Sequence, residues 1–162
     1  MIGKQQFTQE AMALLPALTR IALGILRNGA DAQDAVQQSL LKAWEKRDQA
    51  REDSFRGWLT RIVINQCRDM LRGKKKWVPM ETLPDRPVEE RDYDPPDPVL
   101  AGALAGLKES LRVPLLLRYM EGYSNQEIAG ILNLPATLVK NRLFRARRAL
   151  QNSMTTLREE ER

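Results

Sequence analysis

The side chains best suited to binding another molecule lie between residues 136 and 150, where the sequence has five cations, one amide and one aromatic ring but no carboxylate. At about 3.6 residues per turn, a helix presents most of these groups on one side. The groups on that side and its flanks are Thr137, Lys140, Asn141, Phe144, Arg145, Arg147 and Arg148. In a DNA major groove, cations bind phosphates and guanine, an amide binds adenine, and a ring contacts the thymine methyl group. The segment therefore indicates a DNA-reading helix; a basic amphipathic helix on a membrane or an acidic protein is the alternative.

A short helix must precede and hold that basic helix. Ser124 and Glu127 have the spacing of a capping box, which predicts a helix start. Residues 133–135 then break the helix, and the basic helix begins near Ala136 with an apolar stripe opposite its cations. The stripe consists of Val139, Leu143, Ala146 and Leu150. A capped helix, a tight turn and a basic helix match a helix-turn-helix.

A second basic face is predicted on a helix over residues 55–72, for which Ser54 is a plausible N-cap. Its cations and one amide recur at helical spacing and are followed by a lysine run; they are Arg61, Asn65, Arg68, Arg72 and Lys74. The predicted buried side consists of Phe55, Trp58, Leu59, Ile62 and Met70. Cations beside rings can hold single-stranded nucleic acid. A solvated face is the alternative interpretation.

Two further helices are expected before this one. The first covers residues 8–27, with Pro16 either kinking it or marking a restart. The second covers about 31–47 and is capped by Asp31. It has an apolar side of Val36, Leu40, Ala43 and Trp44, and a polar surface of Asp34, Gln37, Gln38 and Ser39 that is solvated or binds a partner. Residues 46–53 are expected to form a polar loop.

The segment 78–98 differs sharply in composition, since it holds six of the nine prolines and seven acidic residues. Such a sequence buries little apolar surface, so it is predicted to be a flexible linker. The fold class is therefore all-α: a helical domain over 1–76, a linker over 77–98, and a helical domain over 99–162. In the second domain, helices are expected over 99–107 and from a Ser110 cap toward Met120, with Pro114 near the first turn and Tyr119 on the apolar side.

Composition narrows the functional classes. The net charge of +5 and the pI near 9.6 suit a polyanionic partner. With one cysteine and no histidine, a disulfide framework, a Cys/His metal site and a His-based triad are excluded, and neither a catalytic constellation nor a cofactor is predicted. No apolar run is expected to approach the roughly 20 residues of a membrane span, and no secretion signal is recognised. We therefore expect a cytoplasmic location without membrane insertion.

Three motifs in order resemble those of the extracytoplasmic-function (ECF) group of bacterial sigma factors, over nearly the whole chain. They are DAQDAVQQSLLKAW at 31–44, FRGWLTRIVINQCRDMLR at 55–72 and LLLRYMEGYSNQEIAGILNLPATLVKNRLFRARRAL at 115–150. The resemblance implies a dissociable specificity subunit of RNA polymerase that recognises a two-part promoter and catalyses no reaction. It also implies an anti-sigma protein as a partner.

The same resemblance implies roles for the matching residues. Asp34, Gln37 and Gln38 would face the clamp helices of the polymerase largest subunit, and the flap of the polymerase is a further expected contact. Residues 46–53 would hold a flipped base of the minus-ten element, and Asn65 with its basic face would hold the separated strand. The basic helix would read the minus-thirty-five element, although Thr137, Leu138 and Asn141 depart from residues common in the family.

Two rival classes remain open. One is a helix-turn-helix repressor or activator that acts without being a polymerase subunit; such proteins usually bind palindromes as dimers. The other is a recombinase or nuclease with a basic reading domain. Asp31 and Asp34 are better explained as helix-start residues than as metal ligands of such an enzyme.

Overall fold

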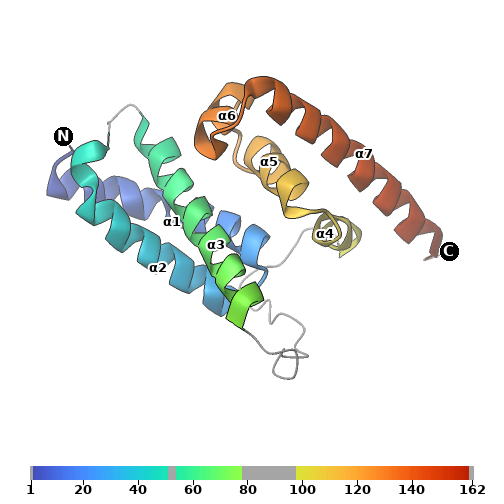
Figure 1. Ribbon diagram of the computed structural model, residues 1–162, viewed down its shortest axis with the longest axis horizontal. Coiled ribbons are helices and arrows are strands. Elements are labelled where there is room, and N and C mark those ends of the chain that lie inside the picture. Colours follow the sequence, from blue (N-terminus) through green and yellow to red (C-terminus); the bar gives the residue numbers. More distant parts are fainter. Residues whose placement is uncertain (1, 51–53, 78–97, 161–162) are drawn as a thin grey trace. The chain divides into compact units, whose positions relative to one another are not determined.

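The computed structural model describes residues 2–50, 54–77 and 98–160; side chains 74–99, Ala101 and those beyond 155 lie outside that description. Every regular element in these ranges is a helix, and the chain divides into two compact units (Figure 1). The first unit contains α1–α3 and the second contains α4–α7. The predicted all-α class with two helical domains is confirmed. Almost all of the expected linker lies outside the described residues.

The first unit consists of α1 (Lys4–Leu26), α2 (Gly29–Glu45) and α3 (Phe55–Trp77), and each of these helices packs against the other two. One end of its core is aromatic. The ring of Phe7 meets those of Trp44 and Phe55 edge-on, with centroid distances of 5.2 and 5.6 Å. Edge-to-face pairs add stabilisation beyond buried area. This cluster joins all three helices at one place.

The start of α2 differs from the sequence expectation. The side chain of Asn28, not of Asp31, caps the helix: its oxygen accepts a hydrogen bond from the Asp31 backbone N–H at 3.0 Å. Asn and Asp are both good N-caps, and the one that precedes the first turn takes the role. Asp31 lies in the first turn, where its negative charge interacts favourably with the helix dipole. Arg27, which precedes the Asn28 cap, ends α1 in a left-handed conformation with φ of 56°.

The first helix also departs from two expectations. It starts at Lys4 and continues through Pro16 without a restart. Its length of 23 residues and a mean hydropathy of 1.3 over an 18-residue stretch reach those of a membrane span, so the expectation that no segment would do so was wrong. Its buried residues, such as Leu18 and Ala22, lie in the core of a unit where α1 packs on α2 and α3. Packing within the unit thus buries part of this apolar helix, 39% of its most apolar stretch.

The second unit consists of α4 (Pro98–Ala105), α5 (Glu109–Tyr119), α6 (Asn125–Leu132) and α7 (Ala136–Glu160). The long α7 packs on the other three helices. The buried guanidinium of Arg112 donates to the Leu107 carbonyl at 2.8 Å and so fixes the turn between α4 and α5.

Two expectations for α5 were wrong. The helix begins directly after Lys108, so Ser110 lies inside the first turn and is not the cap. Pro114 occupies the helix interior rather than the first turn and is buried. The backbone there forgoes one helical hydrogen bond.

Candidate nucleic-acid interface

The turn before α7 sets the direction of the basic helix. The predicted capping box at α6 is confirmed: the Glu127 N–H donates to the Ser124 hydroxyl at 3.1 Å, and the Ser124 N–H donates to the Glu127 carboxylate at 3.0 Å. At the other end, Asn133 adopts a left-handed conformation with φ of 55°, and the Leu134 N–H donates to the Ala129 carbonyl at 2.9 Å. Local bonds at both ends therefore define α6 and the turn into α7.

The apolar stripe of α7 faces inward. Val139, Leu143 and Ala146 are buried, and Leu150 is half-buried. Because opposite sides of a helix point in opposite directions, the basic side faces outward. All seven residues predicted to contact DNA from this helix are exposed: Thr137, Lys140, Asn141, Phe144, Arg145, Arg147 and Arg148.

Phe144 is the unusual member of this surface, since its ring is 52% exposed. The guanidinium of Arg148 lies over the ring at 5.7 Å from its centroid. A cation at this distance is attracted by the ring quadrupole. The ring and the guanidinium are thus held together on the outward face of α7.

Arg147 lies on the flank of that face. Its guanidinium donates to the hydroxyl of Tyr119 on α5 at 2.5 Å. Tyr119 was expected on the apolar side of its helix; it is instead 58% exposed, and the expectation was wrong. A phenol combines an apolar ring with a polar tip, and here the tip orients a predicted DNA contact.

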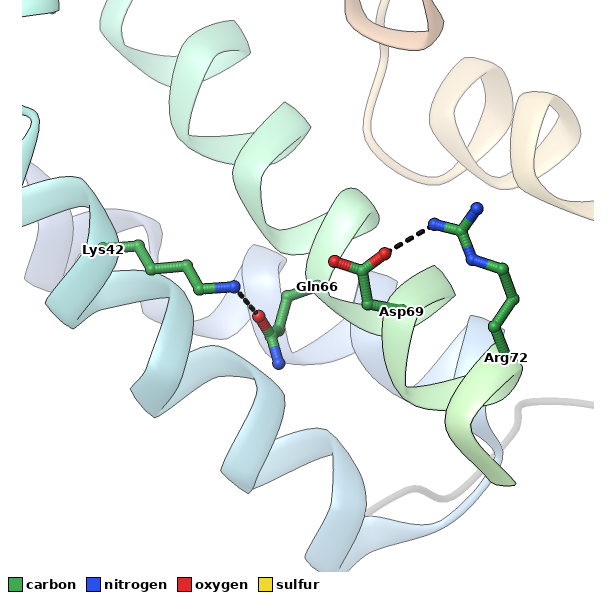
Figure 2. Close-up of polar contacts among 4 residues, drawn as sticks. All are labelled: Lys42, Gln66, Asp69 and Arg72. Carbon is green, nitrogen blue, oxygen red and sulfur yellow. Dashed lines mark hydrogen bonds and ion pairs between the residues drawn. The ribbon is translucent and has the colours of Figure 1, made fainter. Parts of the chain in front are cut away.

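The basic face of α3 is likewise on the surface. Arg61, Asn65 and Arg72 are exposed and Arg68 is half-buried. Arg72 pairs with Asp69 at 2.5 Å, on the side of α3 that is away from α2 (Figure 2). The side chains of this pair are 70% and 57% exposed. An exposed pair of this kind contributes little to stability. The side chain of Lys74 lies outside the described residues.

The buried side of α3 is wider than predicted. Phe55 and Leu59 are buried as expected, whereas Trp58, Ile62 and Met70 are only half-buried. Further residues contribute to the core, namely Val63, Ile64 and Cys67. A helix that packs against two neighbours buries a broader arc than one stripe, which the single-face prediction did not allow for.

The polar surface predicted on α2 is only partly correct. Asp34 and Gln37 are exposed and Gln38 is half-buried, but Ser39 is fully buried. Its hydroxyl donates to the Ala35 carbonyl at 2.6 Å, which satisfies the buried group within its own helix. A residue that the sequence analysis missed is Leu41, which is 66% exposed and lies one turn after Gln37. Two adjacent leucines in a helix point about 100° apart, so Leu40 and Leu41 cannot both enter a narrow core face.

A polar chain that the sequence did not reveal joins α2 to α3. The ammonium of Lys42 donates to the side-chain oxygen Oε1 of Gln66, and the two side chains point toward each other in Figure 2. The Gln66 amide donates to Gln38 at 2.9 Å, and the Gln38 amide donates to Asp34 at 2.9 Å. Two residues of the predicted partner-binding surface therefore connect to the helix with the basic face.

The expected loop at 46–53 is more ordered in its first part than predicted. Residues Arg47–Gln49 form a 3-10 turn, η1, and Ala50 is buried. The guanidinium of Arg47 lies 4.0 Å from the Trp44 ring centroid and donates to the Trp44 carbonyl at 2.8 Å. Residues 51–53 lie outside the described residues.

Comparison with protein families identifies both units. Residues 11–77 match the sigma-70 region 2 family, and residues 99–150 match the sigma-70 region 4 family. The chain is 30% identical to the ECF RNA polymerase sigma-E factor of Haemophilus influenzae over 144 residues, which is 78% of this chain and 76% of the relative. It is 29% identical to the sigma-E factor of Escherichia coli K12, over 78% of this chain and 75% of the relative.

Solved structures show the same architecture. The sigma factor RpoE of Bartonella quintana, in complex with the anti-sigma factor NepR, is 28% identical with a TM-score of 0.76, and the match covers 92% of this chain and 96% of that one. CnrH, in complex with the cytosolic domain of CnrY, is 25% identical with a TM-score of 0.71, over 95% of this chain and 90% of that one. The chain therefore belongs to the ECF group of the sigma-70 family of RNA polymerase sigma factors.

Proposed function

We propose that this chain binds core RNA polymerase through α2, captures the opened minus-ten strand on α3 and reads the minus-thirty-five duplex with α7. The observation that supports this most strongly is the presence of two cationic outward faces, one in each family region. The chain itself makes or breaks no covalent bond in this function. Because its template is chromosomal DNA in a bacterium, it works in the cytoplasm.

The α7 face suits the major groove of a duplex. Arg145, Arg148 and Lys140 are exposed and can contact phosphates or guanine. Asn141 can pair with an adenine edge, and Phe144 can contact a thymine methyl group. A good bidentate contact discriminates between bases by about 1–3 kcal/mol. Asn141 and Phe144 are therefore proposed as the specificity residues, with the cations supplying most of the affinity.

The α3 face suits a single strand. Arg61, Arg68 and Arg72 lie on one side and can follow a phosphate backbone, while Asn65 offers an amide between them. Opening a duplex costs about 1.4 kcal/mol per base-pair step in stacking. Capture of unstacked bases, with the η1 turn beside the strand, offsets this cost.

The α2 face is proposed to bind the polymerase. Asp34, Gln37 and Gln38 supply polar contacts, and Leu41 supplies an apolar group among them. An exposed leucine inside a polar stripe is suited to a pocket on a partner, since burying its side chain is worth about 1.5–3 kcal/mol. Leu41 is thus proposed as the apolar anchor of the contact with the clamp helices, and the second unit is proposed to contact the flap.

A protein inhibitor is proposed as a further partner. Both solved relatives are in complex with a second protein, which is named as an anti-sigma factor in one case. The exposed side chains of Leu41, Met12 and Phe144 give an inhibitor apolar contacts on both units. An inhibitor that covers them would block polymerase and DNA at once.

Transcription in vitro with purified chain, core polymerase and a library of promoters tests the proposed function. We expect enrichment of asymmetric promoters with two separated elements, dependent on both the chain and the core enzyme. Binding of a dimer to palindromic sites without polymerase would instead support the alternative of a helix-turn-helix repressor or activator.

A further inference from the structure

We propose that Gln66 is a positioning residue that couples the polymerase-binding face of α2 to the nucleic-acid face of α3. The inference rests on the proposed function, because both faces take their roles from it. It concerns a residue that lies on neither face: the Gln66 side chain is only 6% exposed and points from α3 toward α2 (Figure 2).

The polar chain through Gln66 runs in one direction, from a cation to an anion. Lys42 donates to Gln66, Gln66 donates to Gln38 and Gln38 donates to Asp34. Three of the four residues, Asp34, Gln38 and Lys42, lie at successive turns of α2. Gln66 comes from α3 and bonds to both Gln38 and Lys42.

The direction follows from the chemistry of the two end groups. A lysine ammonium has donors and no acceptor, and an ionised aspartate has acceptors only. With these ends, the two amides between them have one orientation each that makes all three bonds. Aligned amides of this kind polarise one another, so the bonds are cooperative. A change at one end therefore affects the bond at the other.

Gln66 lies next to residues of the nucleic-acid face in the sequence of α3. Asn65, the preceding residue, is exposed on the basic face, and Arg68 follows two residues later. A buried amide that loses its partners destabilises the fold, because its polar atoms stay out of contact with water. That penalty favours the placement of α3 against α2 in which the Gln66 bonds are made. This placement sets where the side chains of Asn65 and Arg68 lie and which way they face.

The other end of the chain is open to a partner. Asp34 is exposed, Gln38 is half-buried, and both belong to the proposed polymerase contact. A polymerase group that engages Asp34 competes with or reinforces the bond from Gln38. Binding of the core enzyme is thus transmitted through two amides to the helix that holds the opened strand.

The test compares Gln66→Leu with Gln9→Leu, which makes the same change at an exposed position of α1. Three quantities are measured: the affinity for core polymerase, opening of a duplex promoter by 2-aminopurine fluorescence, and transcription from a template already melted at the minus-ten element. For Gln66→Leu we expect opening of the duplex to fall about tenfold, the equivalent of 1.4 kcal/mol, with core affinity unchanged. Transcription from the melted template is expected to be largely retained, and Gln9→Leu is expected to match the unmodified chain.

A purely structural role predicts a different pattern. If Gln66→Leu lowers core affinity, duplex opening and melted-template transcription to the same extent, or leaves opening unchanged, the proposal is wrong. Should this variant not fold, Lys42→Met is measured in the same three assays, since it removes the donor to Gln66 and lies outside the proposed polymerase contact.

The double variant Lys42→Met/Gln66→Leu provides a second criterion. Because both changes break one chain, their effects on opening should be less than additive, whereas additive effects contradict the coupling. Failure of the unmodified chain to open any promoter with core polymerase would overturn the proposed function itself. Normal opening by that chain together with a silent Gln66→Leu would overturn only the inference.

Discussion

The hydroxyl of Tyr119 on α5 accepts a hydrogen bond from the guanidinium of Arg147 on α7 at 2.5 Å. The two residues lie 28 positions apart in the sequence and are both exposed. The bond places Arg147 at the flank of the basic face before any DNA arrives. An arginine oriented in this way loses less conformational freedom when it binds a phosphate.

Tyr119→Phe is therefore expected to weaken binding of minus-thirty-five DNA by about two- to tenfold, the loss of one modest hydrogen bond. Stability should change by less than about 0.5 kcal/mol, because the ring is exposed. Fluorescence anisotropy with a labelled duplex and the holoenzyme measures the affinity. In an Arg147→Ala background the same change should have no effect, and an equal effect there would contradict the orienting role.

Phe144→Ala is expected to separate DNA binding from folding. The exposed ring supports little of the core, so the melting temperature should hardly move. Loss of its contact with a thymine methyl group should cost roughly 1 kcal/mol or more in affinity for the preferred promoter. Met12→Ala truncates another exposed apolar side chain, in the first unit, and serves as the control for DNA affinity. Equal affinities of the two variants would argue against a base contact by Phe144.

Leu143→Ala should show the opposite pattern. Its side chain is buried on the inward side of α7, and truncation of a buried leucine costs about 2–5 kcal/mol. Thermal unfolding followed by circular dichroism should show a strongly destabilised second unit. A variant that unfolds like the unmodified protein would contradict the packing of α7 described above.

The capping box at α6 allows a matched comparison of two serines. Ser124→Ala removes a cap and is expected to cost about 1 kcal/mol of stability. Ser110→Ala, inside the first turn of α5, should be nearly neutral. Unfolding in urea gives both values. If the two variants lose the same stability, the assignment of the caps is incorrect.

Local patterns in the sequence predicted the capping box, the apolar stripe of α7 and its basic face, because each depends on residues within a few turns. The cap of α2 was misassigned since Asn28 and Asp31 are both capping residue types. Ser39 and Tyr119 were misplaced because their exposure depends on which helices pack beside them, which periodicity alone does not reveal.

The contact between Gln38 and Gln66 could not be foreseen. The two residues are 28 positions apart, and a glutamine in a helix is usually solvated. Only the packing of α3 on α2 brings their amides together. Leu41 had a readable signal, because one of two adjacent leucines on a narrow apolar face has to point outward.

Permanganate reactivity of minus-ten thymines tests the central claim most directly. Core polymerase with the unmodified chain should make these thymines reactive on a duplex promoter, and core polymerase alone should not. Reversal of charge in Arg61→Glu/Arg68→Glu should abolish the reactivity while the variant still associates with the core enzyme. Thymines that open equally well with the charge-reversed chain would contradict the account.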